Sequence, residues 1–336
     1  MTSKERVLKT LSFDDPDRIP VDLWVLPVAR MTYGKAFDDI CKKHEVDIAA
    51  VTGPFDHANT NDIYTEGVFV DQWGCQWLNI QPGIIGKVLD TLIDESNIDS
   101  YRPPIERFLK EWEEESQLID NRIQQLRLDG KFITGGWISI FERMQFLRGT
   151  EELLCDIAMC EDDDTLDKMI NIVMPFMRVY LKKWLEKDVD AICFGDDWGT
   201  QISMLVSPDI WRRKFRPAYQ ELFDMIKQAG KKVFFHSDGY IFDIYQDFID
   251  MGVDAINSQL WCMGVQKVAE KFAGKITFWG EVSRQNTLPY GTPGDVQDSA
   301  AIMKELLYIK GGLIGQGEVN GDVPLRNVEA LLSAWH

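Results

Sequence analysis

Short apolar runs alternate with amphipathic stretches along most of this chain, a pattern that predicts repeated strand and helix units around a parallel sheet. The clearest runs, which we interpret as strands, lie at 132–140, 189–197, 232–238, 253–258, 276–282 and 313–318. Two further runs upstream, at 19–25 and 46–51, bring the number of predicted strands to eight. Eight parallel strands are the number that closes a (β/α)8 or TIM barrel, so we expect an α/β fold of this type.

The segments between the predicted strands carry signals for the start and end of helices. Ser207-Pro208 supplies an N-cap and a first-turn proline, and Gly230 stands where a glycine commonly ends a helix. Thr292-Pro293 begins another predicted helix, which ends by Gly311. The short connections that remain are typical of βα units.

One region, at about 62–110, interrupts the alternation. Residues 68–79 are consistent with two extended segments joined by a turn near Gly74, and Pro82-Gly83 and Pro103-Pro104 follow. We interpret the region as a hairpin insertion in the N-terminal half that covers the mouth of the barrel. A long charged helix is predicted next, at 105–128, and residues 1–336 are expected to form a single domain.

Composition and charge argue against several classes of partner. The chain has 36 Lys and Arg against 54 Asp and Glu, a net charge of -18, and contains no basic segment that could follow a phosphate backbone. We therefore expect neither nucleic acid nor a membrane surface as a partner. Six cysteines without a CxxC pair argue against a disulfide framework. The N-terminus lacks the apolar core of a signal peptide, so a cytoplasmic protein is expected, and a homodimer is one possible assembly.

Polar residues follow most of the predicted strands, and barrel enzymes place their reactive groups at the carboxyl ends of strands. His236 and Asp238 close one strand and are two residues apart, which places both on one side of an extended chain. Such a pair can bind a divalent metal or transfer protons. The alternative is that His236 only hydrogen-bonds inside the barrel while Asp238 caps a helix. The other histidines, His44, His57 and His336, are assigned to surface or loop positions.

Two further groups of carboxylates also follow predicted strands. Asp196 and Asp197 lie between glycines, and because neighbouring strand residues point to opposite sides, only one of them is expected to face the cavity. Helix capping is the alternative role for the other. Glu281 and Glu318 end the last two strands and, together with His236, could form an oxygen-rich metal site.

A salt bridge to Arg284 or Arg326 is the alternative role for these two glutamates. We thus assign Asp196, Asp197 and Asp238 as candidate catalytic residues, and His236, Glu281 and Glu318 as candidate metal ligands.

Several tryptophans lie near the same strand ends and suggest an apolar pocket. Packing at the top of the barrel is the alternative for each of them, but together they favour a small, mostly apolar or methylated ligand over a polyanion. We assign as candidate substrate-binding residues Trp24, Trp137, Trp198, Asn257 and Trp279.

Several ordered motifs together resemble the uroporphyrinogen decarboxylase family, which includes zinc-dependent methyltransferases that act with corrinoid proteins. The motifs are Glu5 to Leu11 with Pro16 to Val21, Asp71 to Gly74, Gly195 to Gly199 with Ser207-Pro208, His236 to Gly239, and Asp322 to Asn327. The resemblance implies a barrel over essentially the whole chain, while the type of reaction within the family varies.

The sequence departs from both branches of this family at informative positions. The decarboxylases have an arginine-rich stretch after the first strand, where this chain has a single arginine, Arg30, in an apolar setting. Relatives in the methyltransferase branch hold zinc through a His-x-Cys pair and a second cysteine, where this chain has Asp238 and the neighbourhood of Gly317 and Glu318. The resemblance therefore implies transfer of a methyl group between a small methylated substrate and a corrinoid on a partner protein, with zinc bound by harder ligands.

Two other interpretations remain open. The first is a metal-independent lyase or decarboxylase of a smaller acid, in which Asp196 or Asp197 handles the proton and Arg143 or Arg148 binds the carboxylate. The second is a corrinoid-binding or tetrapyrrole-binding barrel without catalytic activity.

Overall fold

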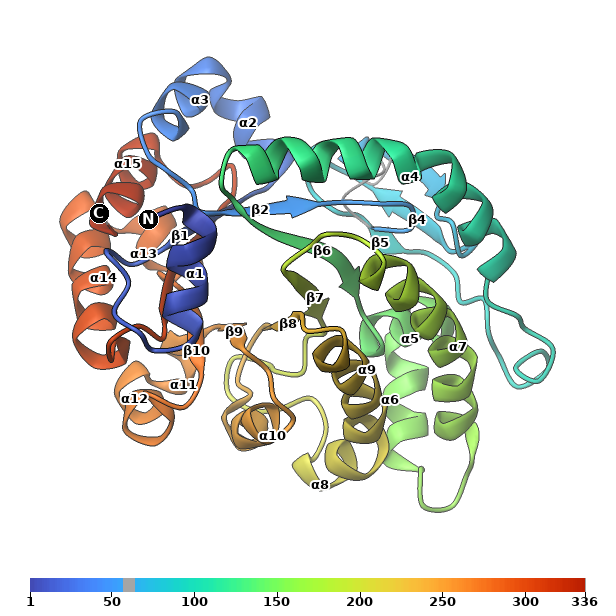
Figure 1. The fold of residues 1–336 in the computed structure, drawn as a ribbon. Coiled ribbons are helices and arrows are strands. Elements are labelled where there is room, and N and C mark those ends of the chain that lie inside the picture. The colour runs from blue at the N-terminus through green and yellow to red at the C-terminus, as the bar shows by residue number, and fades with distance from the viewer. Residues whose placement is uncertain (57–63, 336) are drawn as a thin grey trace.

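Eight parallel strands form a nearly closed barrel in the computed structural model, which describes residues 1–56 and 64–335 (Figure 1). The strands pair in the order β1-β11-β10-β9-β8-β7-β6-β2. They are β1 (Val21–Val25), β2 (Ile48–Val51), β6 (Phe132–Ile138), β7 (Ala191–Gly195), β8 (Lys232–Ser237), β9 (Ala255–Ser258), β10 (Thr277–Glu281) and β11 (Leu313–Val319). Each coincides with one of the eight apolar runs, so the predicted TIM barrel is confirmed.

The two ends of this strand order, β1 and β2, lie beside each other and bring the barrel close to closure. The backbone amide of Asp47, just before β2, donates a 2.7 Å hydrogen bond to the carbonyl of Val21 in β1. The carboxylate of Asp47 also accepts a 2.7 Å hydrogen bond from the amide of Val21. Arg6 and Arg18 balance the charge of this fully buried aspartate.

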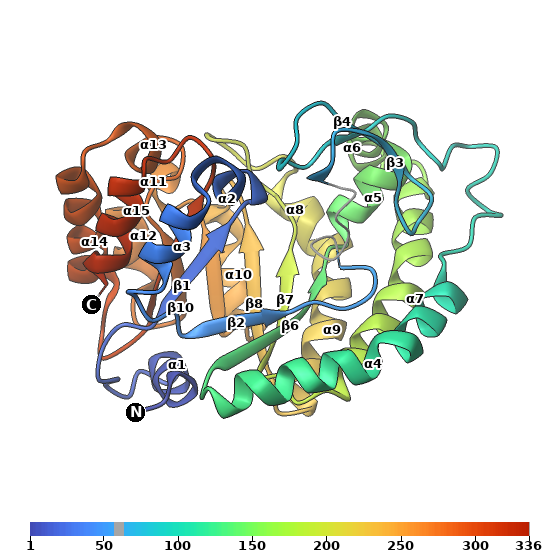
Figure 2. The ribbon, with the colours of Figure 1, turned by 90° about the horizontal axis from the view of Figure 1, so that it is seen from above.

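Helices surround the sheet on its outer side (Figures 1 and 2). Apolar strand residues such as Ile192, Val233 and Phe235 are fully buried. The helices that precede or flank the first strands are α1 (Ser3–Leu11), α2 (Pro27–Tyr33), α3 (Lys35–Cys41) and α4 (Ile105–Leu128). Those of the middle of the chain are α5 (Phe141–Arg148), α6 (Thr150–Ala158), α7 (Thr165–Leu185), α8 (Pro208–Ile210), a π-helical turn at Trp211–Phe215, and α9 (Arg216–Gln228). The last third holds a 3-10 turn at Phe242–Ile244, α10 (Tyr245–Asp250), α11 (Leu260–Met263), α12 (Val265–Phe272), α13 (Thr287–Tyr290), α14 (Pro293–Leu307) and α15 (Leu325–Ala334).

The predicted helix signals act as expected in the structure. The Ser207 hydroxyl caps α8, and Thr292 forms a capping box with Asp295 at the start of α14. Gly230 follows α9 with a φ of +71°, a conformation that a residue with a Cβ adopts only at a cost. None of the described helices has the length and apolar character needed to cross a membrane.

The predicted insertion is a small antiparallel sheet made of β3 (Gly67–Val70), β4 (Gln76–Asn79) and β5 (Lys87–Val88). The turn predicted near Gly74 is present between β3 and β4, and Gly74 has a φ of +96°. Asp71 organises this turn, because one carboxylate oxygen accepts hydrogen bonds from the amides of Trp73 and Cys75. Its other oxygen lies 3.0 Å from Nη1 of Arg143 on α5, so a buried ion pair fastens the insertion to the barrel.

Candidate active site

His236 ends β8 inside the barrel and has a defined hydrogen-bond partner on the next strand. Its Nδ1 lies 2.6 Å from Oδ1 of Asn257, and Nδ2 of Asn257 donates to the carbonyl of Trp279 at 2.6 Å. Because that carbonyl can only accept, the side-chain amide of Asn257 must present its oxygen to the histidine. Nδ1 of His236 therefore carries a hydrogen, which leaves Nε2 as the ring nitrogen available to bind a metal.

Nε2 of His236 faces two carboxylates at the same rim of the barrel. It lies 3.5 Å from Oδ1 of Asp197, which follows β7, and 3.5 Å from Oδ1 of Asp238, which follows β8. One donor atom from each of these three residues lies within 4.8 Å of the others. Burial and the charge of Asp238 raise the pKa of Asp197. The two carboxylates therefore repel each other, and a bound cation would relieve this repulsion.

The donor set fits a zinc ion of the catalytic type, which has three protein ligands and one open position. Two ligands of a tetrahedral zinc ion, each about 2.1 Å from the metal, are about 3.4 Å apart, close to the 3.5 Å that separates Nε2 of His236 from each carboxylate oxygen. Asp238 Oδ1 is buried and has no hydrogen-bond partner among the described residues, although a buried polar atom normally has one. A cation between these side chains would satisfy it.

Glu281 and Glu318 meet a different partner, Arg284, in the loop after β10. Nη1 of Arg284 lies 2.5 Å from Oε2 of Glu318, and its Nε lies 3.8 Å from Oε1 of Glu281. Arg284 also contacts the carboxylate of Asp238. This contact links Arg284 and its two glutamates to the cluster of His236, Asp197 and Asp238. The ion pair with Arg284, one of the two alternatives drawn from the sequence, is therefore present. Burial raises the pKa of Glu281 to about 8.

A large cavity of about 790 Å³ lies beside His236 and is lined by three of the predicted tryptophans. The ring of Trp24 packs edge-on against Trp279 at 5.0 Å and against His236 at 5.1 Å, and Trp137 is 5.8 Å from Trp24. The insertion contributes Trp77, Ile85 and Gly86 to the wall, which supports its predicted position over the mouth. Glu318 also lines this cavity, so the cavity and the carboxylate network share a border.

Asp22 on β1 orients two of these tryptophans. One oxygen of its carboxylate accepts hydrogen bonds from the indole nitrogens of Trp24, at 3.1 Å, and Trp279, at 2.9 Å. Burial raises the pKa of Asp22 to about 6. We did not predict Asp22 from the sequence, although strand alternation places it on the same face as Trp24 and could have revealed it.

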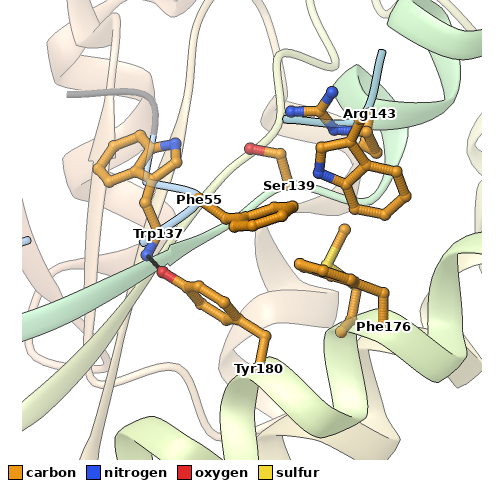
Figure 3. Close-up of a pocket in the computed structure, with 8 residues that line it drawn as sticks. Phe55, Trp137, Ser139, Arg143, Phe176 and Tyr180 are labelled. Carbon is orange, nitrogen blue, oxygen red and sulfur yellow. Dashed lines mark hydrogen bonds between the residues drawn. The ribbon is translucent and has the colours of Figure 1, made fainter. Parts of the chain in front are cut away.

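The backbone of Trp137 is held by a hydrogen bond to a side chain on α7. The hydroxyl of Tyr180 on α7 accepts a 3.0 Å hydrogen bond from the backbone amide of Trp137 (Figure 3). The same hydroxyl also contacts the carboxylate of Asp56. Behind Trp137 lies a small pocket of about 20 Å³ that Phe55, Ser139 and Arg143 help to line. Asp56 lines the large cavity as well, and burial raises its pKa to about 7.

The predicted site residues that do not line the large cavity are Asp196, Asp197, Trp198, Asp238, Asn257 and Glu281. Asp196 and Trp198 also lie apart from the cluster of His236, Asp197 and Asp238. The fully buried carboxylate of Asp196 accepts hydrogen bonds from the amides of Ile140, at 2.7 Å, and Glu142, at 2.8 Å, and so caps the start of α5. Trp198 stacks on Phe141 at 4.1 Å in the core between the sheet and its helices. Both point away from the barrel axis because side chains alternate along an extended segment.

Glu142 is a cavity residue that the sequence did not indicate. It lies at the start of α5, and burial together with the charges of Asp197 and Asp196 raises its pKa well above the usual value. No strand pattern could have revealed it, since its position depends on how α5 leaves β6. Of the histidines, His44 lies in the loop after α3, and His57 and His336 are outside the described residues.

The two arginines considered for a decarboxylase are both engaged elsewhere. Arg143 pairs with Asp71, and Arg148 pairs with Asp156 at 2.9 Å and with Glu95 at 2.5 Å. Neither lines the large cavity.

A protein of known structure shares this architecture. A methyltransferase from Methanosarcina mazei has a similar fold, with a TM-score of 0.73 and 16% sequence identity over 99% of this chain and 98% of that chain. The YdhT protein from Bacillus subtilis aligns with a TM-score of 0.46 and 10% identity over 98% of this chain and 87% of that chain. A sequence comparison with curated proteins finds no match. The model of the uroporphyrinogen decarboxylase (URO-D) family matches residues 2–336, and the chain belongs to that family.

Proposed function

We propose that this protein is a methyltransferase that moves a methyl group between a small methylated substrate and a corrinoid carried on a partner protein, with the help of a bound zinc ion. The proposal rests most directly on the cluster of His236, Asp197 and Asp238 beside a cavity with aromatic walls. The fold that the chain shares with the Methanosarcina mazei methyltransferase supports it.

His236, Asp197 and Asp238 would hold the metal in this scheme. A bound zinc ion would supply a Lewis-acidic site that orients a polar group of the substrate beside the cavity. The chain itself orients the histidine through Asn257, positions the substrate against Trp24 and Trp137, and excludes water with the walls of the cavity. The reactive corrinoid would approach over the open rim, since it is carried by another protein.

A decarboxylase of the uroporphyrinogen type has less support in this chain. Its substrate carries several carboxylates and requires positively charged groups to bind them. The described residues that line the large cavity include Asp22, Asp56, Glu142 and Glu318 but no lysine or arginine. The cavity would therefore repel a polyanion.

Metal analysis combined with an activity assay tests the proposal. Protein purified without chelator is expected to contain about one zinc ion per chain, and His236→Ala should lose it while His44→Ala, altered in a loop outside the barrel mouth, retains it. Methyl transfer is then followed by the change in cobalamin absorbance when cob(I)alamin and candidate methyl donors are added.

Zinc-free wild-type protein with full transfer activity would rule out the role of the metal. Release of carbon dioxide from a small acid, without any methyl transfer, would favour the lyase instead.

A further inference from the structure

The walls of the large cavity combine aromatic rings with carboxylates in a way that selects the charge of a ligand. Six aromatic side chains line it: Trp24, Tyr64, Trp77, Trp137, Phe146 and Trp279. Four carboxylates, those of Asp22, Asp56, Glu142 and Glu318, line it too. Among the described lining residues there is no lysine or arginine, and His236 is the one side chain that could carry a positive charge.

Trp24 and Trp279 present their ring surfaces to the cavity and not their hydrogen-bond donors. The indole N–H groups of both Trp24 and Trp279 are bound to Asp22, so a ligand meets the carbon edges and π faces of these rings. A π face is electron-rich and attracts cations, and sites for quaternary ammonium groups are commonly built from several aromatic rings. A negatively charged ligand would find neither a donor from these two indoles nor a counter-charge.

The carboxylates of the cavity lack a positively charged partner on the cavity wall. Burial raises the pKa of Asp22 to about 6 and that of Asp56 to about 7, which reflects the free energy needed to ionise them without a counter-ion. Arg284 contacts Glu318 but also Asp238 and Glu281, so a single cation is shared among three acids. A bound cation would therefore be stabilised by negative charge that the chain itself does not balance.

We infer that the large cavity binds a methylated cation, of the quaternary ammonium or sulfonium class, as the methyl-bearing substrate. This inference rests on the proposed methyl-transfer function and specifies its substrate class. In that reaction cob(I)amide would displace the methyl group to form methyl-cob(III)amide, and the bonding electron pair would stay on nitrogen or sulfur, so that a neutral amine or thioether leaves. A neutral methyl ether would use the aromatic walls alone and would leave the four carboxylates without a role. The volume of about 790 Å³ is ample for a small ligand of this class.

Binding of matched probes to the wild-type protein tests the inference directly. Isothermal titration calorimetry would compare choline and tetramethylammonium with 3,3-dimethylbutan-1-ol, which has the shape of choline but carbon in place of the charged nitrogen, at constant ionic strength. We expect choline to bind at least about tenfold more tightly than the neutral alcohol, because the aromatic rings and the carboxylates of the cavity both attract a cation. Equal affinities for the two, absence of saturable binding of either cation, or tighter binding of methoxybenzene would overturn the inference.

Substitutions of Glu142 and Trp137 test whether choline binds in the large cavity. Glu142→Gln removes, at nearly constant shape, a carboxyl group whose ionised form a bound cation would favour, and it should weaken choline binding several-fold while leaving the alcohol unaffected. Glu305→Gln, which removes an exposed charge on α14, is the matched control and should change neither. Trp137→Leu should weaken choline binding more than Trp137→Phe does, because phenylalanine retains a π face. Unchanged choline affinity in Glu142→Gln and Trp137→Leu would place the cation elsewhere and refute the inference.

The outcome can be separated from that of the proposed function, because binding of the probes requires neither corrinoid nor partner protein. Selective cation binding without methyl transfer to cob(I)alamin would support the inference and count against the proposed reaction. Methyl transfer from a neutral ether, in a protein that does not prefer cations, would support the reaction and refute the inference.

Discussion

Nδ1 of His236 lies 2.6 Å from Oδ1 of Asn257, and this contact directs the other ring nitrogen toward Asp197 and Asp238. The partner of a metal-binding histidine fixes its tautomer and the orientation of its ring. The sequence indicated Asn257 only as a residue near the substrate. In the structure it is a positioning residue for the candidate metal ligand.

Replacement of Asn257 by alanine should therefore weaken zinc binding by about 10-fold to 100-fold, the usual effect of losing such a partner. Competition with a chromophoric chelator measures the affinity. Gln316→Ala is a matched control, because the buried amide of Gln316 accepts a hydrogen bond from Nδ2 of Asn257, and its loss leaves the contact between Oδ1 of Asn257 and His236 in place. Equal zinc affinities in the two variants would show that the His236–Asn257 contact does not support the metal.

Asp196 should matter for stability and not for metal binding. Asp196→Ala leaves the amides of Ile140 and Glu142 and the hydroxyl of Tyr219 without their acceptor, which should lower the free energy of unfolding by roughly 1–3 kcal/mol. Chemical denaturation measures the loss, and zinc content per folded chain should stay at the wild-type level. A fall in zinc content of the folded protein would instead indicate a role for Asp196 in the site.

Asp22 should impose a pH dependence on stability. Its pKa is about 6 in the folded chain and lower, near 3.8, when exposed, so the folded state binds the proton more tightly. The stabilisation by this group is complete below about pH 4 and is lost as the pH rises through about 6. Between about pH 4 and about pH 7 the wild type should lose about 2–3 kcal/mol relative to Asp22→Asn, at 1.36 kcal/mol per pKa unit. Parallel stability curves from urea denaturation would contradict this.

Gly195 should control the position of Trp137. A Cβ at residue 195 would lie 2.2 Å from Cζ2 of Trp137, too close for any real contact, so Gly195→Ala must displace the indole. We expect a changed tryptophan fluorescence spectrum and loss of choline binding. Gly294→Ala, where the nearest atom would be 3.6 Å away, controls for the added methyl group and should leave both unchanged. Normal choline binding by Gly195→Ala would show that the displaced indole is not part of the binding site.

The barrel was predictable because each strand is a continuous apolar run, whereas the site was predictable only in part. Alternation correctly placed His236 beside Asp238 and separated Asp196 from Asp197, since both relations are local to one strand. Arg284 and Glu142 could not be placed in this way, because loops and helix starts set their positions. Trp198 shows the opposite failure. It lies close to a strand end in the sequence, yet it packs outside the barrel.

The buried ion pair between Asp71 and Arg143 has a consequence for the range of ligands that can bind. It ties the small sheet of β3, β4 and β5 to α5, and replacing either partner alone would cost about 3–5 kcal/mol because the other charge would stay buried without a counter-ion. The sheet therefore behaves as a rigid wall instead of a swinging cover. Bulky compounds would be rejected by steric exclusion, and selectivity for size would persist even when the reaction partner is absent.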